Sequence, residues 1–318
     1  MAFEDPADRI DRLVSALEPA FRAAFMEVVR RTFDENSLHE LEDLLSAGRY
    51  EEALAAVESH AAVLGAEWAR SFTTAAENTE AFLMRNQVRV VYNQVNARAV
   101  SAMQSNRLRL VREFSQQQRA ATAEALVNGV REGVNPREMA LRFRESIGLT
   151  QAQQRMVDNY RHALQRGDKG DALGRELRDR RFDPTVRNLD KAPLTGQQID
   201  RMVERYRERF LKYRSEVIAR TESLRSVHEG NQEMYRQAVE SGDLDPTLLQ
   251  RKWEASGDSR VRDSHRHMDG QVRGLDEPFK SGDGNNLQYP GDINAPASDS
   301  IQCRCRIGTT LLPNPEFV

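Results

Sequence analysis

The sequence predicts a mainly α-helical chain, in which an extended multi-helix domain is followed by a small C-terminal α+β module rich in strands and loops. Two observations support this prediction. Before Gly242, apolar residues recur three and four positions apart over most of the chain, which is the spacing of a helical stripe. After Gly242, glycine and proline become frequent and apolar runs become short. We therefore expect an N-terminal helical region at residues 1–75, a helical domain at 76–245 and a small C-terminal module at 250–312.

The first part of the chain carries helix signals in order. A helical stripe runs from Asp8 to Arg31, and Pro19 inside it is expected to introduce a kink. The segment SLHE at residues 37–40 can form a capping box, because its serine can accept a hydrogen bond from the amide of its glutamate. From Tyr50 to Val100 the helical pattern is long enough to contain at least one break. The valines of NQVRVVYNQVNARAV in its last part would also suit a strand.

Glycine, proline and polar residues mark the ends of the next helices. Gly133 closes one helix, and Asn135 and Pro136 fit the cap and the first turn of the next. Gly148 then ends that helix. The segment from Gly167 to Pro193 is rich in charge, glycine and proline, which predicts loops around a short helix.

The last expected helix is the longest. It runs from about Gly196 to Ser241, and a break near Lys212 is one alternative. The C-terminal module that follows has few large apolar side chains for its size. A module of fewer than about 70 residues is marginally stable unless something staples it or a neighbour covers it.

The composition and the N-terminal residues disfavour a membrane protein and a secreted protein. Charged residues make up 30% of the 318 residues. No run of about 18 apolar residues exists, so we expect a soluble chain without a membrane partner. The N-terminus MAFEDPADRIDR is acidic where a secretory signal would be basic and then apolar. This predicts a chain that is cytoplasmic when it is made.

The net charge of −3 is unevenly distributed along the chain. Residues 101–220 hold 25 basic and 16 acidic side chains, whereas residues 1–100 hold 10 basic and 17 acidic ones. Such an excess is typical of a surface that meets an acidic partner such as nucleic acid. The alternative is a set of solvated helix faces whose charges are paired within the chain. Both interpretations stay open at this point.

Two short segments of the C-terminal module carry its chemistry. The segment DSRVRDSHRHMDG spans residues 258–270, and IQCRCRIG at residues 301–308 holds the only two cysteines of the sequence. In an extended strand, Cys303 and Cys305 point to the same face. A disulfide between them is disfavoured, because their α-carbons would lie near the upper limit of the permitted separation and the cytoplasm is reducing.

Two explanations of the cysteine pair remain. In the first, Cys303 and Cys305 join one or both of His265 and His267 in a structural zinc site, which would explain how a weak core stays folded. In the second, no metal is bound and the reduced thiols lie beside a structural polar cluster. The members of that cluster would be Asp258, Arg260, Arg262, His265 and Asp269.

An enzymatic role finds little support in these residues. A cysteine, a histidine and an aspartate can form a nucleophile with its base. However, no recognisable oxyanion loop, GxxxxGK[ST] phosphate loop or GxGxxG motif accompanies them. We therefore expect no catalytic residues, and no cofactor other than the zinc of the first explanation.

A series of short motifs occurs in the C-terminal module in the order W…GDSRVRDSHRHMDG…EPF…YPGD…APAS…IQCRCRI. This order resembles the C-terminal module of the phage head morphogenesis proteins, the Mu F-like minor head family. One departure is Gln302, where the family usually has asparagine. Upstream, IARTES at residues 218–223 resembles the Arg-Thr-Glu signature that the family carries on a helix before the module.

The resemblance implies a minor capsid protein of a phage or prophage that acts without turnover in head morphogenesis and DNA packaging. It implies a place in the virion, in the head or at the portal vertex, after assembly in the host cytoplasm. Portal protein and major capsid protein are the implied partners, and the basic segment could meet double-stranded DNA without sequence preference. Two alternatives remain, a toxin-associated or enzymatic Mu F-like module and a scaffold that is removed during maturation.

The resemblance also implies a role for Arg220 and Glu222, which from chemistry alone would form a pair on a helix surface. In a member of the family, they are expected to anchor the helical domain to the C-terminal module. An arginine–carboxylate contact at such a junction is geometrically selective. Asp258 or Asp263 is the expected partner of Arg220.

Overall fold

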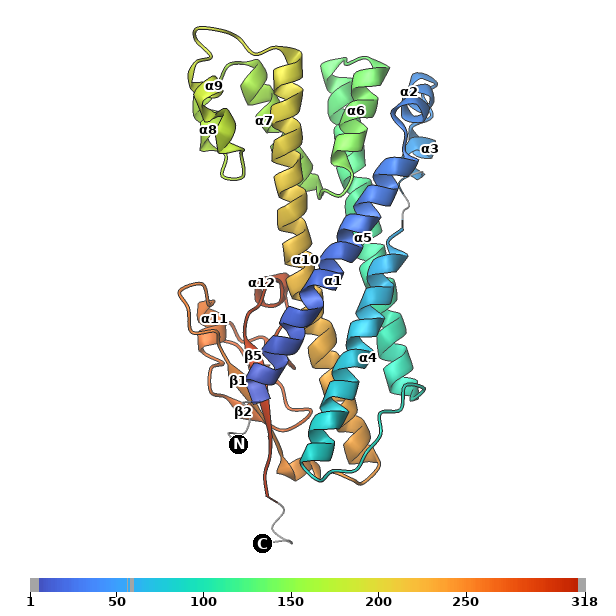
Figure 1. The fold of residues 1–318 in the computed structure, drawn as a ribbon, viewed down its shortest axis with the longest axis vertical. Coiled ribbons are helices and arrows are strands. Elements are labelled where there is room, and N and C mark those ends of the chain that lie inside the picture. Colours follow the sequence, from blue (N-terminus) through green and yellow to red (C-terminus); the bar gives the residue numbers. More distant parts are fainter. Residues whose placement is uncertain (1–5, 56, 58–59, 314–318) are drawn as a thin grey trace. The chain divides into compact units, whose positions relative to one another are not determined.

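The computed structural model describes residues 6–55, 57 and 60–313, and its fold is mainly helical with short antiparallel strands in the C-terminal region, as predicted (Figure 1). The α-helices are α1 (Pro6–Glu35), α2 (Leu38–Ser46), α3 (Tyr50–Ala55), α4 (Ala62–Arg85), α5 (Ala97–Glu132), α6 (Pro136–Ser146), α7 (Gln151–Gln165), α8 (Lys169–Gly174), α9 (Asp183–Arg187), α10 (Gly196–Glu240), α11 (Asp263–Arg266) and α12 (Ala297–Ser300). The short 3-10 helices are η1 (Arg180–Phe182) and η2 (Pro246–Leu248). The strands are β1 (Leu249–Glu254), β2 (Val272–Arg273), β3 (Phe279–Lys280), β4 (Asn286–Leu287) and β5 (Arg306–Leu311).

The chain groups into two compact units. Unit 1 takes in Met1–Ala24, Leu64–Arg109 and Glu216–Val318, and unit 2 takes in Phe25–Val63 and Leu110–Ser215. The long helices α1, α5 and α10 each contribute residues to both units. Unit 1 combines residues from all three regions expected from the sequence, whose boundaries stay a prediction.

Helix ends follow the signals in the sequence. The Asn135 side chain accepts a hydrogen bond from the amide of Glu138 at 2.9 Å, and Pro136 lies in the first turn of α6. At the start of α2, the Ser37 hydroxyl accepts from the amide of Glu40 at 3.2 Å. Each bond satisfies an amide that has no partner inside its own helix. These caps explain why the two helices begin where the sequence predicts.

The pattern between Tyr50 and Val100 is broken, as predicted. After α3 and α4, residues 88–96 form neither helix nor strand before α5 begins. The valines at 88, 90, 91 and 95 therefore lie in a connection, whereas Val100 lies in α5, and the segment forms no strand. In contrast, α10 runs unbroken through Lys212, and α1 continues through Pro19 as one helix.

Unit 2 is built around apolar side chains from its helices. One cluster joins α2 and α3 with α5 and α6. Its buried members are Leu41, Leu45, Ala53, Leu54, Val57, Leu126, Met139, Ala140 and Phe143. On α2 and on α6 these positions recur three or four residues apart, so each helix presents one apolar stripe to the cluster.

The end of α6 depends on a glycine, as the sequence predicts. Gly148 has a φ of +85°, and a Cβ at this position would lie 2.6 Å from Leu211 and 2.7 Å from Val29. Any other residue would therefore be strained and would also collide with its neighbours. The carbonyl of Gly148 accepts a hydrogen bond from Arg214 at 2.6 Å. Burial lowers the pKa of this guanidinium to about 10.

The C-terminal part of unit 1 contains a three-stranded antiparallel sheet in the order β2-β1-β5. Along the β1–β5 ladder, Trp253 lies opposite Ile307. The strands β3 and β4 form a separate antiparallel pair, in which Phe279 lies opposite Leu287. These four side chains are buried in one cluster, so both sets of strands contribute to the same core.

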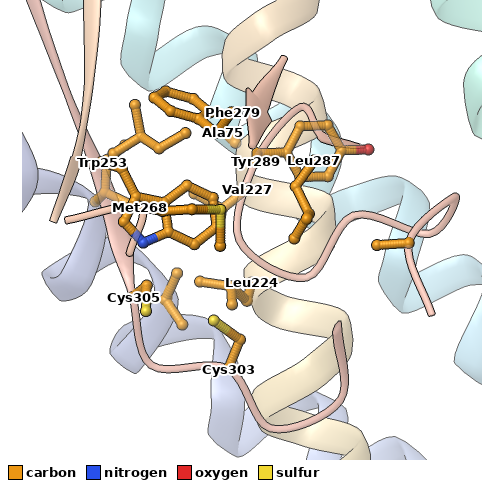
Figure 2. Close-up of a cluster of buried hydrophobic side chains, with 14 of the residues drawn as sticks. Ala75, Leu224, Val227, Trp253, Met268, Phe279, Leu287, Tyr289, Cys303 and Cys305 are labelled. Atoms are coloured by element: carbon orange, nitrogen blue, oxygen red, sulfur yellow. The ribbon is translucent and has the colours of Figure 1, made fainter. Parts of the chain in front are cut away.

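Helices complete the core of these strands (Figure 2). The rings of Trp253 and Phe279 are fully buried and pack edge to face, with centroids 5.3 Å apart. The helices contribute Ile10, Val14 and Leu17 from α1, Ala75 from α4, and Leu224 and Val227 from α10. The first turns of α1 lie beside β1 and β5 (Figure 1), where Arg306 donates to Asp8 at 2.9 Å. The sparse apolar content of the C-terminal strands is therefore covered by neighbouring helices.

Candidate functional site

The two motif segments of the C-terminal region meet at a buried histidine. The helix α11 carries His265, and Cys303 and Cys305 lie on the segment that leads into β5. Only 1% of His265, 1% of Cys303 and 2% of Cys305 is exposed. The ring of His265 packs edge-on against Trp253, with centroids 5.6 Å apart. The thiols and the histidine thus share one apolar enclosure.

One ring nitrogen of His265 faces both thiols. Its Nδ1 lies 3.5 Å from Sγ of Cys303 and 3.4 Å from Sγ of Cys305. The candidate ligand atoms of the three residues all lie within 4.8 Å of one another. In the described part of the chain, no other group of three histidine, cysteine or acidic side chains comes close enough to share a metal ion.

The other ring nitrogen of His265 faces a carboxylate. Its Nε2 lies 3.6 Å from Oδ1 of Asp299, which is buried. The hydroxyl of Ser264 donates to Oδ1 of Asp299 at 3.0 Å, and the amide of Asn285 donates to Oδ2 at 2.9 Å. This arrangement favours the tautomer with its proton on Nε2, which turns the lone pair of Nδ1 toward the sulfurs. We call His265, Asp299, Cys303 and Cys305 the histidine–thiol cluster.

The two thiols differ in acidity. A hydrogen bond from Cys305 lowers the pKa of Cys303 below its ordinary value, and the positive charges of Arg262 and Arg220 add to this effect. The same hydrogen bond raises the pKa of Cys305, and burial raises it further. The pair therefore loses its protons in two steps, with Cys303 first.

Contacts with α10 hold the thiol segment in place. The Nε of Arg220 donates to the carbonyl of Cys303 at 3.2 Å, and the amide of Gln302 donates to Oγ1 of Thr221 at 3.1 Å. Gln302 has a φ of +54°. This left-handed conformation is unfavourable for glutamine and better tolerated by asparagine.

Asp258 forms an ion pair beside the cluster. Its carboxylate accepts two hydrogen bonds from Arg304, and this pairing lowers the pKa of Asp258. Oδ1 of Asp258 also accepts from the amide of Arg260 at 2.9 Å, while the Arg260 side chain is exposed. Arg262 donates to the carbonyl of Ile301 at 2.5 Å. These residues fix the backbone around the thiols and do not touch the sulfurs.

His267 and Asp269 lie apart from the thiols. His267 is exposed and does not belong to the group of ligand atoms around His265. Asp269 is also exposed, and its Oδ1 accepts from the amide of Ala255 at 2.8 Å. Of the polar residues selected from the sequence, His265 alone brings its side chain to both sulfurs.

The prediction that Arg220 pairs with Asp258 or Asp263 is wrong. Arg220 donates to Glu18 of α1 at 2.9 Å, whereas Asp258 and Asp263 pair with other arginines. The physical reason is tertiary, because α1 brings its acidic side chain from 202 positions away in the sequence. No local pattern around Arg220 records this contact.

Glu222 is buried between two arginines. Its carboxylate accepts from Arg109 at 2.9 Å and from Arg225 at 2.7 Å, and only 4% of the residue is exposed. Arg225 donates in turn to the carbonyl of Gly291 in the YPGD segment at 2.8 Å. Together with Arg220, Arg225 joins α10 to the backbone of the C-terminal region.

Sequence reasoning missed two buried carboxylates. Asp299 directly follows the APAS motif, and its place in that motif series is the signal that could have identified it. Glu229 of α10 accepts from the Tyr289 hydroxyl at 2.6 Å and from the Asn106 amide at 2.7 Å. Burial raises the pKa of Glu229 to about 7. A glutamate inside a long helix gives no sequence signal of this kind.

The histidine–thiol cluster has the residue types of a nucleophile, a base and an orienting acid. The near-complete burial of these side chains argues against a catalytic role. No member is more than 2% exposed, so a substrate cannot approach either sulfur in this conformation. The chemistry that fits a sealed imidazole with two thiols is metal binding or a hydrogen-bonded structural contact.

Comparison with known proteins identifies a family for the part of the chain that contains this site. Residues 154–308 match the family described as "Phage Mu protein F like protein". This segment contains all four members of the histidine–thiol cluster and the whole of α10. This segment of the chain belongs to the Phage Mu F-like family, as the order of its motifs predicts.

A named relative adds detail. The chain is 33% identical over 94 residues to the "Minor head protein GP7" of Bacillus phage SPP1. This match covers 30% of the present chain and 29% of the relative, so the chain spans less than a third of the curated protein it matches. No solved structure matches the chain. Within the described residues, no helix is long and apolar enough to cross a membrane.

Proposed function

We propose that this chain is a minor head protein of a phage or prophage that takes part in head morphogenesis without catalysis. The observation that carries the proposal is the family match over residues 154–308, which includes helical elements and the C-terminal strands. The relative that is named a minor head protein supports the same role. We further propose a position at or near the portal vertex, with portal protein and major capsid protein as partners.

The architecture of unit 1 suits an assembly part. Side chains of α10 hold the C-terminal region through backbone carbonyls at Cys303 and Gly291. Such contacts fix the position of a folded region and need no turnover. The sealed histidine–thiol cluster, which offers no access to a substrate, supports a non-enzymatic role.

Co-purification tests the proposed portal association. The tagged full chain is expressed together with the portal protein and the major capsid protein of the same phage. We expect portal protein to be retained with the tagged chain, and we expect the portal protein of an unrelated phage to be lost in the same procedure. Equal retention or equal loss of the two portal proteins would contradict the association.

Mass spectrometry of purified mature particles tests whether the protein stays in the virion. A resident minor head protein is expected to give peptides from the whole chain in mature heads, in few copies relative to the major capsid protein. A scaffold that is removed during maturation would be present in precursor particles and absent from mature ones.

Double-stranded DNA is the less supported partner. Many arginines of the basic segment form ion pairs within the chain, which favours the alternative of internally balanced charge. Examples are Arg119–Glu51, Arg142–Glu132, Arg155–Glu124, Arg161–Glu145, Arg178–Asp183 and Arg205–Glu208. If DNA binds, phosphate contacts must dominate, and its affinity is expected to fall steeply as salt rises. Binding that is absent at low salt, or that does not change with salt, would remove DNA from the proposal.

A further inference from the structure

We infer that His265, Cys303 and Cys305 form a structural zinc site, to which these three side chains contribute the ligands. The first argument is distance. A tetrahedral zinc ion with Zn–S bonds of about 2.3 Å and a Zn–N bond of about 2.0 Å holds sulfur and nitrogen about 3.5 Å apart. The two sulfur–nitrogen distances in the cluster are 3.5 and 3.4 Å. One ion can therefore reach all three atoms with little movement of the chain.

The atoms around Nδ1 of His265 suit a shared cation. A neutral imidazole whose Nε2 proton faces Asp299 offers its lone pair at Nδ1. Both sulfurs lie at nearly the same distance from this nitrogen. A cation between the three atoms explains this arrangement, because thiolate and imidazole are ligands that zinc prefers.

The surroundings of His265 have the form found around metal-bound histidines. Such histidines donate their second N–H to a carboxylate or a carbonyl, which fixes the tautomer and the ring orientation. Nε2 of His265 faces Asp299, and that carboxylate is itself held by Ser264 and Asn285. The hydrogen bonds from Ser264 and Asn285 fix the carboxylate 3.6 Å from Nε2, and this buried ring nitrogen has no hydrogen-bond partner in the described residues. Asp299 is therefore a positioning residue for the histidine and lies on the far side of the ring from the sulfurs.

A zinc ion at this site would join two distant segments of the C-terminal region. His265 and the thiols are 38 and 40 positions apart in the sequence. Figure 2 shows both cysteines beside Leu224 of α10, in the apolar cluster that also contains Trp253. The free energy of metal binding adds to the stability of a fold that the metal holds together. This staple would supplement the cover that the helices give to a sparse core.

Metal analysis of the full chain tests the site. The protein is produced without a polyhistidine tag, purified under reducing conditions and analysed by plasma mass spectrometry before and after incubation with zinc. We expect about one zinc ion per chain, and exchange with cobalt is expected to give the absorption of tetrahedral thiolate-bound Co²⁺. Folded, reduced protein that holds no zinc even after incubation would overturn the inference.

Variants locate the ion. Cys303→Ser, Cys305→Ser and His265→Ala are each expected to weaken zinc binding, and the two serine variants are expected to weaken the cobalt–thiolate absorption. His267→Ala is the matched control, because it removes an exposed histidine of the same segment and is expected to keep one zinc ion per chain. Asp299→Asn is expected to lower zinc affinity roughly 10- to 100-fold while the cobalt–thiolate absorption remains at saturating metal.

Two outcomes would contradict the assignment whatever the folding of the variants. Full zinc content in the Cys303→Ser/Cys305→Ser protein would show that the ion binds elsewhere. Loss of zinc in His267→Ala would show that His267 is needed for zinc binding, against its use as the control. Where a variant does not fold, the metal content of the natural chain decides. The inference does not rest on the proposed role in the phage head, so a failed portal experiment leaves it unchanged.

Discussion

The apolar clusters of the two units are closed in different ways. In unit 2, the cluster around Phe143 consists of apolar side chains that come mainly from four helices, and on α2 and α6 they form local stripes. In unit 1, the cluster around Trp253 serves short strands, includes two thiols and takes in side chains from α1, α4 and α10. The comparison teaches that helices bring their own core signal, whereas these strands depend on partners that are distant in the sequence and on buried polar groups.

The largest expected effect comes from removing both thiols of the histidine–thiol cluster. Cys303→Ser/Cys305→Ser leaves a buried imidazole and carboxylate without the sulfurs that complete their surroundings, and we expect a loss of about 3–5 kcal/mol in unit 1. Hydrogen exchange should show this loss at the amides of β1 and β5 and little change in α6. Equal losses in both regions would contradict a local role for the thiols.

The two histidines of the HRH segment provide a matched comparison. His265→Ala is expected to lower the thermal stability clearly, because the ring is buried between the thiols and Asp299. His267→Ala is expected to change it little, because the side chain is exposed. Two equal and negligible losses in thermal denaturation would remove His265 from its assigned place.

Glu222→Gln probes the buried ion pairs that join the helices of unit 1. The substitution removes the charge of a buried carboxylate that contacts both Arg109 and Arg225, and we expect a loss of about 3 kcal/mol. Glu138→Gln in unit 2 is the control, since its partner Arg142 keeps a second carboxylate in Glu132. Chemical denaturation compares the two variants. A control loss as large as that of Glu222→Gln would show that burial does not distinguish these pairs.

The raised pKa of Glu229 predicts that the stability of unit 1 depends on pH. Its pKa in the folded chain is about 7, raised mainly by burial above the ordinary value of 4.5. A raised pKa contributes stability that is fully present below pH 4.5 and is lost as pH rises through 7. The expected loss is of the order of 2–3 kcal/mol between about pH 5 and 8. Denaturation curves should show a shallower pH dependence for Glu229→Gln over this range, and an unchanged slope would contradict the assignment.

The smallest expected effect is a gain in stability at the thiol segment. Gln302 occupies a left-handed conformation, with a φ of +54°. Gln302→Asn and Gln302→Gly are each expected to stabilise the chain by about 0.5–1 kcal/mol, because both residues tolerate this conformation better. Thermal denaturation measures the gain, with Gln302→Ala as a control that should give none. Stabilisation by alanine as well would point to a cause other than the backbone.

The parts of the fold that sequence predicted are those with local causes. Asn135 capped α6 and Gly148 ended it because the side-chain oxygen and the left-handed φ act within a few residues. The meeting of His265 with the thiols was also foreseen, since two chemically distinctive segments in a small region had few other partners. These successes required no knowledge of how distant helices pack.

The parts that sequence did not predict have distant causes. Arg220 pairs with Glu18 of α1, and nothing within its own helix favours that partner over Asp258. Asp299 was missed because an aspartate in a helix as short as α12 gives no sign of burial until the fold places it beside His265. The sequence indicated only that the small C-terminal module needs either a staple or cover from a neighbouring element. The helices that cover this module are distant from it in the sequence, so only the tertiary structure identifies them.

The central claim is that the C-terminal strands share their core with α1. Val14 of α1 is fully buried in the cluster that contains Trp253. Val14→Ala removes two methyl groups from this core, and we expect the free energy of exchange for the slowest amides of β1 and β5 to fall by about 2 kcal/mol. Hydrogen exchange followed by mass spectrometry gives this value directly, with α6 of unit 2 expected to stay unchanged. Full protection of β1 and β5 in Val14→Ala would contradict the claim.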